Sequence, residues 1–154
     1  MTRIAGWLAC AGAAVLLIVA MVLGTAPVSA ATKVRVTDAW IRLAAVPGRP
    51  AAGYFTLLAG PSPVELTGVA SPLARVELHA MSMAGGVMRM NTLRSVRVAA
   101  EARISFAPAG NHLMLFNLPA SIAPGASVPL IFRFADGATI KVDATAHSLT
   151  PPPV

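Results

Sequence analysis

Hydrophobic and polar residues alternate in short segments along most of this chain. In residues 75–81, Val76 and Leu78 fall on one face of an extended strand, and Glu77 and His79 fall on the other. Segments of similar length, rich in Val, Ile, Leu, Phe and Thr, predict strands at 34–37, 54–58, 87–90, 102–106, 112–118, 130–134 and 139–142.

Turn-forming residues separate these segments. Gly85-Gly86 can supply the positive φ angles of a tight turn, and Asp136-Gly137 is a strong hairpin signal between two apolar runs. After the first thirty residues, no window of a dozen residues keeps a 3.6-residue hydrophobic period. We therefore predict a single all-β domain, an antiparallel β-sandwich of the Greek-key type.

The N-terminus has the organisation of an export signal. Arg3 is followed by an uncharged run over residues 4–24 and by the small residues Val28-Ser29-Ala30. We expect residues 1–30 to be a signal peptide, or an uncleaved anchor helix, because the run is long enough to cross a bilayer. The β-domain is expected at 31–146, outside the cytoplasm in the periplasm, with residues 147–154 as a disordered tail.

The chain has one cysteine, Cys10, and it lies inside this leader. A lipid-anchored cysteine needs an aliphatic residue three positions earlier, where Trp7 stands, so the sequence argues against a lipid anchor. The exported domain then contains no disulfide, no thiolate nucleophile and no thiolate metal ligand.

Charge excludes a nucleic-acid-binding protein. The whole chain has 12 Lys and Arg against 6 Asp and Glu, and only Arg3 of these lies in the leader. The basic residues of the domain are spread singly along the sequence, without the cluster that a nucleic-acid arm needs.

Methionine and histidine gather in one part of the domain. All the methionines after residue 31 fall between Met81 and Met114, together with His79 and His112. Methionine that only fills gaps in a core would be dispersed over every strand. His112 and Met114 share a strand face, His79 is on the polar face of its own strand, and Met90 follows the Gly85-Gly86 turn. Three neighbouring segments can therefore bring four neutral ligands to one point.

The type of ligand indicates the metal. Thioether sulfur is a soft donor that favours Cu(I), whereas Mg²⁺ and Ca²⁺ require oxygen ligands, of which this window offers only Glu77 and Glu101. Zinc with two methionine ligands would be unusual, and a blue-copper centre requires a cysteine. The sequence predicts a site for one Cu(I) ion made by His79, Met90, His112 and Met114.

The spacing of these residues resembles that of the periplasmic copper(I) chaperone family known as PCuAC. The family signature is a histidine, ten residues, a methionine, twenty-one residues and His-x-Met, and His79, Met90, His112 and Met114 satisfy every interval. The resemblance also covers 38–42, 52–57, 77–81, 86–90 and the C-terminal hairpin. The chain departs from the pattern at Asn111, where we expect an aromatic residue, and in the glycine-poor segment 91–101.

The resemblance implies a cupredoxin-like sandwich that is not an enzyme. It also implies a monomeric carrier that delivers Cu(I) toward the dinuclear copper centre of cytochrome c oxidase. The acceptor would be subunit II of the oxidase or an assembly factor, and contact with the membrane would occur only through an uncleaved anchor. Nucleic acid is not an expected partner.

Two other functions remain open at this point. A copper-sequestering or resistance protein could use the same four ligands without an oxidase acceptor, and a structural sandwich domain would bind no metal. The other three methionines, Met81, Met83 and Met88, are expected mainly to pack around the site, with Met81 as a candidate additional thioether. His147 is expected to be a solvated residue near the C-terminus.

Overall fold

A computed structural model describes residues 34–148, and every regular element in that range is a β-strand. No helix in the described range is long and apolar enough to cross a membrane. The expected signal or anchor segment, 1–30, and most of the expected tail lie outside the described residues. The strands are β1 Arg35–Arg42, β2 Ala51–Leu58, β3 Val64–Ala70, β4 Arg75–Ala84, β5 Val87–Leu93, β6 Val96–Val98, β7 Arg103–Phe106, β8 His112–Phe116, β9 Ser127–Phe134 and β10 Thr139–His147.

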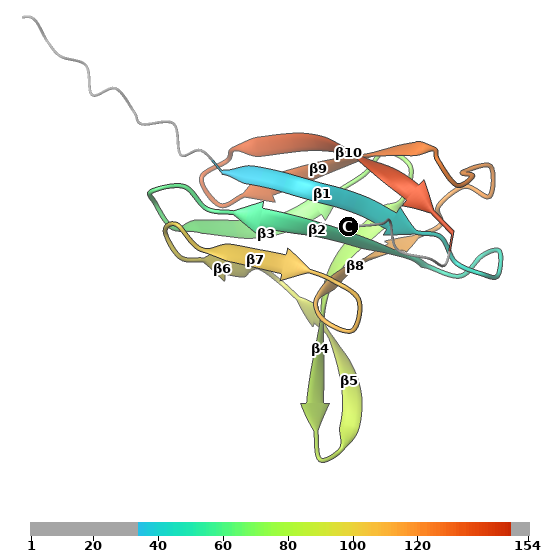
Figure 1. The fold of residues 1–154 in the computed structure, drawn as a ribbon, viewed down its shortest axis with the longest axis horizontal. Helices are drawn as coiled ribbons and strands as arrows, with labels where there is room; N and C mark the ends of the chain where they lie inside the picture. The colour runs from blue at the N-terminus through green and yellow to red at the C-terminus, as the bar shows by residue number, and fades with distance from the viewer. Residues whose placement is uncertain (1–33, 149–154) are drawn as a thin grey trace, which may run out of the picture. The chain divides into compact units, whose positions relative to one another are not determined.

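The strands form one hydrogen-bonded path that folds over on itself. Its order is β5-β4-β8-β2-β1-β10-β9-β3-β6, and β7 pairs separately with β2. Figure 1 shows β9 and β3 passing behind β1 and β2. The two layers meet through side chains, since the ring of Phe55 on β2 lies 4.8 Å from the ring of Phe132 on β9. The predicted all-β sandwich is confirmed.

The core lies between these layers and follows from the alternation in the sequence. On β9, Val128, Leu130 and Phe132 are fully buried, and the residues between them are more exposed. On β8, Leu113 and Leu115 are also fully buried. Burying a large aliphatic or aromatic side chain contributes about 1.5–3 kcal/mol, so these positions dominate the stability of the fold.

The structure differs from the expected strands in three ways. Two strands, Val64–Ala70 and Val96–Val98, were not predicted. One strand pair, β1 with β10, is parallel rather than antiparallel. Strand β10 extends to His147, one residue into the segment expected to be a tail, and the His147 ring makes an edge contact with Trp40 at 6.0 Å. The expectation that His147 is merely solvated is therefore wrong.

Strands β4 and β5 form a hairpin that extends beyond the sandwich (Figure 1). Ala84 pairs with Val87, so Gly85 and Gly86 make a two-residue turn. Their φ angles are 60° and 75°, the left-handed values that such a turn requires and that glycine adopts without steric cost. The Gly-Gly turn predicted from the sequence is confirmed.

Candidate metal site

The register of three neighbouring strands places the candidate ligands on one face of the sheet. Strand β4 lies between β5 and β8, so the three segments are neighbours in the sheet. His79 on β4 is directly opposite His112 on β8, and Met81 is directly opposite Met90 on β5. Met114 is two residues beyond His112 on β8. Residues directly opposite each other, and residues two apart on one strand, point to the same side of a sheet.

The two histidines form a buried pair. Their ring centres are 5.9 Å apart, and their planes are inclined by 38°. His79 is 9% exposed and His112 is 8% exposed, which makes them the buried polar residues of the described domain. The sequence places both on the polar face of their strands, but that face is covered here and water is largely excluded from the rings.

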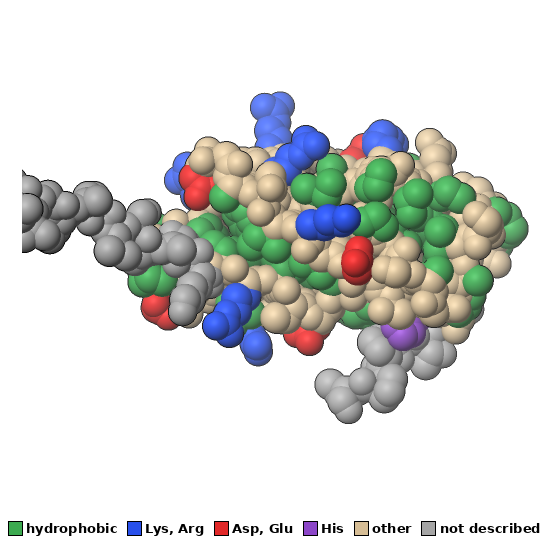
Figure 2. Space-filling view, turned by 90° about the horizontal axis from the view of Figure 1, so that it is seen from above, with side chains coloured by type: hydrophobic (Ala, Val, Ile, Leu, Met, Phe, Trp, Pro, Cys, Tyr) green, Lys and Arg blue, Asp and Glu red, His purple; other side chains and the backbone are tan. Residues whose placement is uncertain are grey.

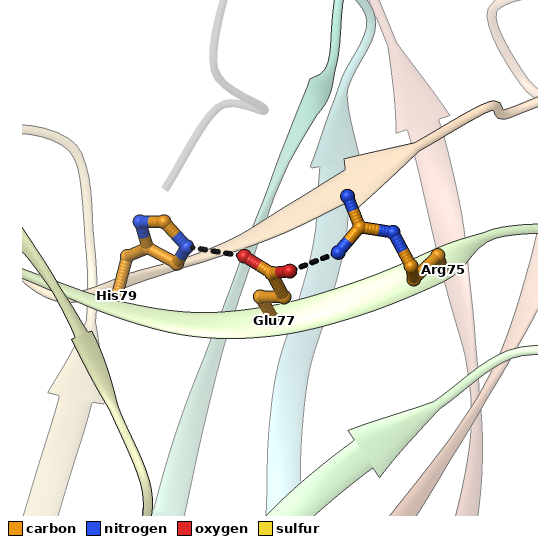
Figure 3. A network of polar contacts seen from close by, with 3 residues as sticks. All are labelled: Arg75, Glu77 and His79. Atoms are coloured by element: carbon orange, nitrogen blue, oxygen red, sulfur yellow. Dashed lines mark hydrogen bonds and ion pairs between the residues drawn. The ribbon is translucent and has the colours of Figure 1, made fainter.

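The hydrogen bonds of His79 define which ring nitrogen is available. Its Nε2 atom lies 3.0 Å from a carboxylate oxygen of Glu77, and Glu77 also pairs with Arg75 (Figure 3). A carboxylate can only accept, so Nε2 carries the proton and Nδ1 carries the lone pair. Nδ1 is buried and has no hydrogen-bond partner among residues 34–148. A buried acceptor without a partner costs folding free energy unless a ligand binds to its lone pair.

His112 is fixed through its other nitrogen. Its Nδ1 atom lies 3.0 Å from the backbone carbonyl oxygen of Gly110, to which it donates a hydrogen bond. The lone pair of His112 is therefore on Nε2. Metal-binding histidines commonly donate their second ring N–H to a carboxylate or a backbone carbonyl, and these two residues show both arrangements.

A cavity of about 290 Å³ opens beside this pair. Three of the four candidate ligands, Met90, His112 and Met114, line it, together with Met81. The rest of the lining comes from Arg42, Pro50, Ala52, Tyr54 and Ala109. His79 does not line the cavity itself and reaches it only through its neighbour His112. The structure thus brings three candidate ligands to one cavity and places the fourth against its wall.

These donors fit a soft metal ion. An ion bound to imidazole lies about 2 Å from the nitrogen, so ring centres 5.9 Å apart are at a separation that one shared ion can span. No group of three or more His, Cys, Asp or Glu side chains in residues 34–148 is arranged to hold a metal. The methionines that line the cavity add thioether sulfur to the imidazole of His112, and thioether with imidazole is a donor set suited to Cu(I).

Two ionisable side chains beside the site, Glu77 and Tyr54, have shifted pKa values. The hydrogen bond from His79 is the main cause that lowers the pKa of Glu77, and Arg75 adds to the effect. Burial raises the pKa of Tyr54, which keeps its hydroxyl neutral at the cavity wall. Glu77 therefore stays ionised behind His79 and favours the Nε2–H form of the ring.

Two of the three remaining methionines differ from expectation. Met81 is half-buried and lines the cavity. Met83 is 67% exposed and Met88 is 53% exposed. The expectation that Met83 and Met88 pack around the site is wrong, because both lie on the part of the hairpin that leaves the sandwich.

Sequence reasoning missed the two groups that orient the histidines. Glu77 is two residues before His79, so strand alternation already placed them on one face, and this spacing was the available signal. The contribution of Gly110 is a backbone carbonyl, which no side-chain pattern can reveal.

Comparisons with known proteins identify the family and the fold of the chain. Residues 34–146 match the LpqE-like family, described as "Putative lipoprotein LpqE-like". The curated protein "Putative lipoprotein Lxx21020" of Leifsonia xyli subsp. xyli is 28% identical over 117 residues, covering 75% of this chain and 70% of that protein.

Two solved structures share the fold. The copper-bound PCuAC domain from PmoF2 has a TM-score of 0.63 at 19% identity, covering 75% of this chain and 93% of that one. The CuI-DR1885 solution structure from Deinococcus radiodurans has a TM-score of 0.53 at 29% identity, covering 73% of this chain and 78% of that one. The resemblance to PCuAC proteins is thereby confirmed. The chain belongs to the LpqE-like family, and its domain has the fold of PCuAC copper-binding domains.

Proposed function

We propose that this protein is an extracytoplasmic copper(I) chaperone that binds one Cu(I) ion through His79, Met90, His112 and Met114. The observation that carries the proposal is the buried histidine pair, in which Nδ1 of His79 has no partner within residues 34–148 and His112 borders a cavity lined by three thioethers, two of them from the candidate ligands Met90 and Met114. Four neutral ligands leave the site with the single positive charge of Cu(I). None of the thioethers must lose a proton to bind.

The names of structural relatives support the choice of cargo. The PmoF2 domain is copper-bound, and the DR1885 protein is in its CuI form. The DR1885 protein is 29% identical to this chain, so the likeness extends beyond the fold. The spacing of the four candidate ligands in this chain and their soft donor atoms also indicate Cu(I).

A carrier must also release its cargo, and the ligands differ in exposure in a way that permits this. Met90 is 48% exposed on the outer strand of the hairpin, whereas both histidines are below 10% exposed. An acceptor can therefore displace Met90 first and exchange the buried ligands afterwards. We propose the dinuclear copper centre of cytochrome c oxidase as the destination, through subunit II or an assembly factor.

The location follows from the leader and from the names of relatives. Residues 1–30 are expected to export the domain to the periplasm, and relatives of the chain are named lipoproteins. The position of Trp7 before Cys10 argues against a lipid anchor in this chain. Either a signal peptide or a lipid anchor would place the domain outside the cytoplasm. We also propose that the protein is a monomer and is not an enzyme.

Anaerobic competition with a chromophoric Cu(I) chelator tests the binding site. His112→Ala and Met114→Ala should each weaken Cu(I) binding by more than about 100-fold, since changes to the groups behind metal ligands already cost about 10–100-fold. His147→Ala is the matched control, because His147 is not among the residues that line the cavity and its ring lies against Trp40. Unchanged affinity in both ligand variants would remove the assignment.

The two rival functions make different predictions. A metal-free structural domain predicts that Cu(I) changes neither the native mass nor the melting temperature, whereas a tight ligand must raise the latter. A sequestering protein would bind Cu(I) equally well but would serve no oxidase. Under copper limitation, a deletion strain should lose oxidase activity and regain it only with the wild-type gene, not with the His112→Ala form.

A further inference from the structure

The protruding hairpin exposes methionine side chains that the candidate copper site does not use. Met83 on β4 and Met88 on β5 are directly opposite each other, and they are 67% and 53% exposed. Large apolar side chains on a surface lose the favourable burial that normally selects them, so a pair of them at one position calls for another explanation.

The pair continues the face that carries the copper ligands. Met81 and Met90 are the next directly opposed pair on this face, two residues closer to the sandwich. Directly opposed residues have Cβ atoms about 4.5–5.5 Å apart, and each methionine has three rotatable bonds, so several sulfurs can meet above the ribbon. The Gly85-Gly86 turn fixes this register.

The two faces of the hairpin differ in chemistry. The opposite face carries Ser82, Arg89 and Asn91 beside Ala80, Ala84 and the exposed Val87, and the Asn91 side-chain amide donates to the Ser82 hydroxyl at 3.2 Å. A hairpin exposed only for solubility would carry polar residues on both faces. Here the thioethers occupy one face alone. Arg89, which is the charged residue of the hairpin closest to the turn, lies on the other face.

We propose that Met81, Met83 and Met88 form a second, weaker Cu(I) site on the hairpin, adjacent to the candidate site at His79 and His112. Thioether sulfur is a soft, uncharged donor that selects Cu(I) over harder ions. Binding is weaker than at the histidine pair because the exposed side chains of Met83 and Met88 must be ordered in water. The inference rests on the proposed function for the identity of the cargo, but not for its own ligands.

The second site has a place in the carrier's action. Met81 lines the cavity that also contains Met90, His112 and Met114, while Met83 extends toward the exposed turn. An ion held by Met81 and Met83 is thus one exchange step from the buried pair. The hairpin methionines offer an arriving ion, or an acceptor, contact at the surface before the histidines are engaged.

Methyl-labelled methionine gives the test. The protein, with ¹³C-methyl methionine, is titrated anaerobically with Cu(I) and followed by NMR. The first equivalent should shift the Met90 and Met114 methyl signals, and further Cu(I) should shift those of Met83 and Met88. In a Met83→Leu/Met88→Leu variant the second event should vanish while the first is unchanged, because leucine keeps an apolar side chain of similar volume but has no sulfur.

The outcomes separate the two proposals. If Met83 and Met88 stay unshifted through several equivalents, or if the double variant still takes a second ion with the same affinity, the hairpin site is refuted and the proposed function stands. If the hairpin signals shift and the Met90 and Met114 signals do not, the proposed function fails and the hairpin site stands. An unchanged amide spectrum of the variant verifies that both strands remain folded.

Discussion

The β4–β5 hairpin has imidazole donors near its base, where the neighbouring β8 adds His112, and thioether donors at its tip, and the two environments are opposite. At the base, His79 and His112 are buried and held by Glu77 and by the Gly110 carbonyl. At the tip, Met83 and Met88 are more than half exposed and are held only by the hairpin backbone. The base has preorganised ligands, and the tip has mobile ones.

This difference in burial explains how one sheet can both hold an ion and exchange it. Groups whose orientation is fixed in advance bind more tightly, because less conformational entropy is lost on binding. Groups at an exposed tip bind weakly but can be reached by a partner protein. The strength of binding should therefore fall along β4 from His79 to Met83.

Figure 2 shows basic side chains spaced apart over another face of the molecule rather than gathered as a docking patch.

The largest expected effect is at the base. Leu113 lies between His112 and Met114 and is fully buried, so Leu113→Ala should lower the free energy of unfolding by about 2–5 kcal/mol. Met88→Ala at the tip should change it by less than about 0.5 kcal/mol, because the side chain is exposed. Urea denaturation measures both. Equal losses would show that the tip is packed as firmly as the base.

A smaller effect is expected from the group that orients His79. Glu77→Gln keeps the shape of the side chain but removes its charge, so Cu(I) affinity should fall by about 10-fold or more. Glu65→Gln is the matched control, since Glu65 accepts a hydrogen bond from Ser95 and pairs with Arg97 on the β3–β6 side of the fold. The same affinity for the two variants would mean that Glu77 does not position the ring.

The smallest effect is expected from the turn. Gly86 has φ of 75° with no atom within 4 Å of an added Cβ, so Gly86→Ala adds backbone strain of about 1–2 kcal/mol and no clash. Strain of this size should speed hydrogen exchange of the β5 amides by about 5–30-fold and leave the sandwich amides unchanged. Gly48→Ala, at φ of 78° in an equally open loop, should leave β5 unaffected. Faster exchange throughout the sandwich would contradict an independent hairpin.

The sequence predicted the parts of the fold that depend on local patterns. Alternation revealed the segment around His79, and Gly85-Gly86 located the hairpin turn, because both depend only on neighbouring residues. Strand β6, with three residues, is too short for alternation to be detected. The parallel pairing of β1 with β10 joins residues far apart in the sequence, which no local pattern encodes.

The candidate site was predicted in its residues but not in its details. Ligand spacing and strand faces placed His79, His112 and Met114 together, since strand geometry converts spacing into direction. The burial of the histidine pair depends on the segments that cover it, and the exposure of Met83 and Met88 depends on how far the hairpin extends beyond the sandwich. Both are properties of the assembled fold.

The most direct test of the central claim is copper K-edge X-ray absorption on the Met83→Leu/Met88→Leu protein with one equivalent of Cu(I). Removing the tip sulfurs leaves Met81, Met90 and Met114 as the methionines beside the cavity. We predict a single Cu(I) site with two sulfur and two nitrogen neighbours, supplied by Met90, Met114, His79 and His112. A first shell without sulfur, or one made of oxygen alone, would contradict the account.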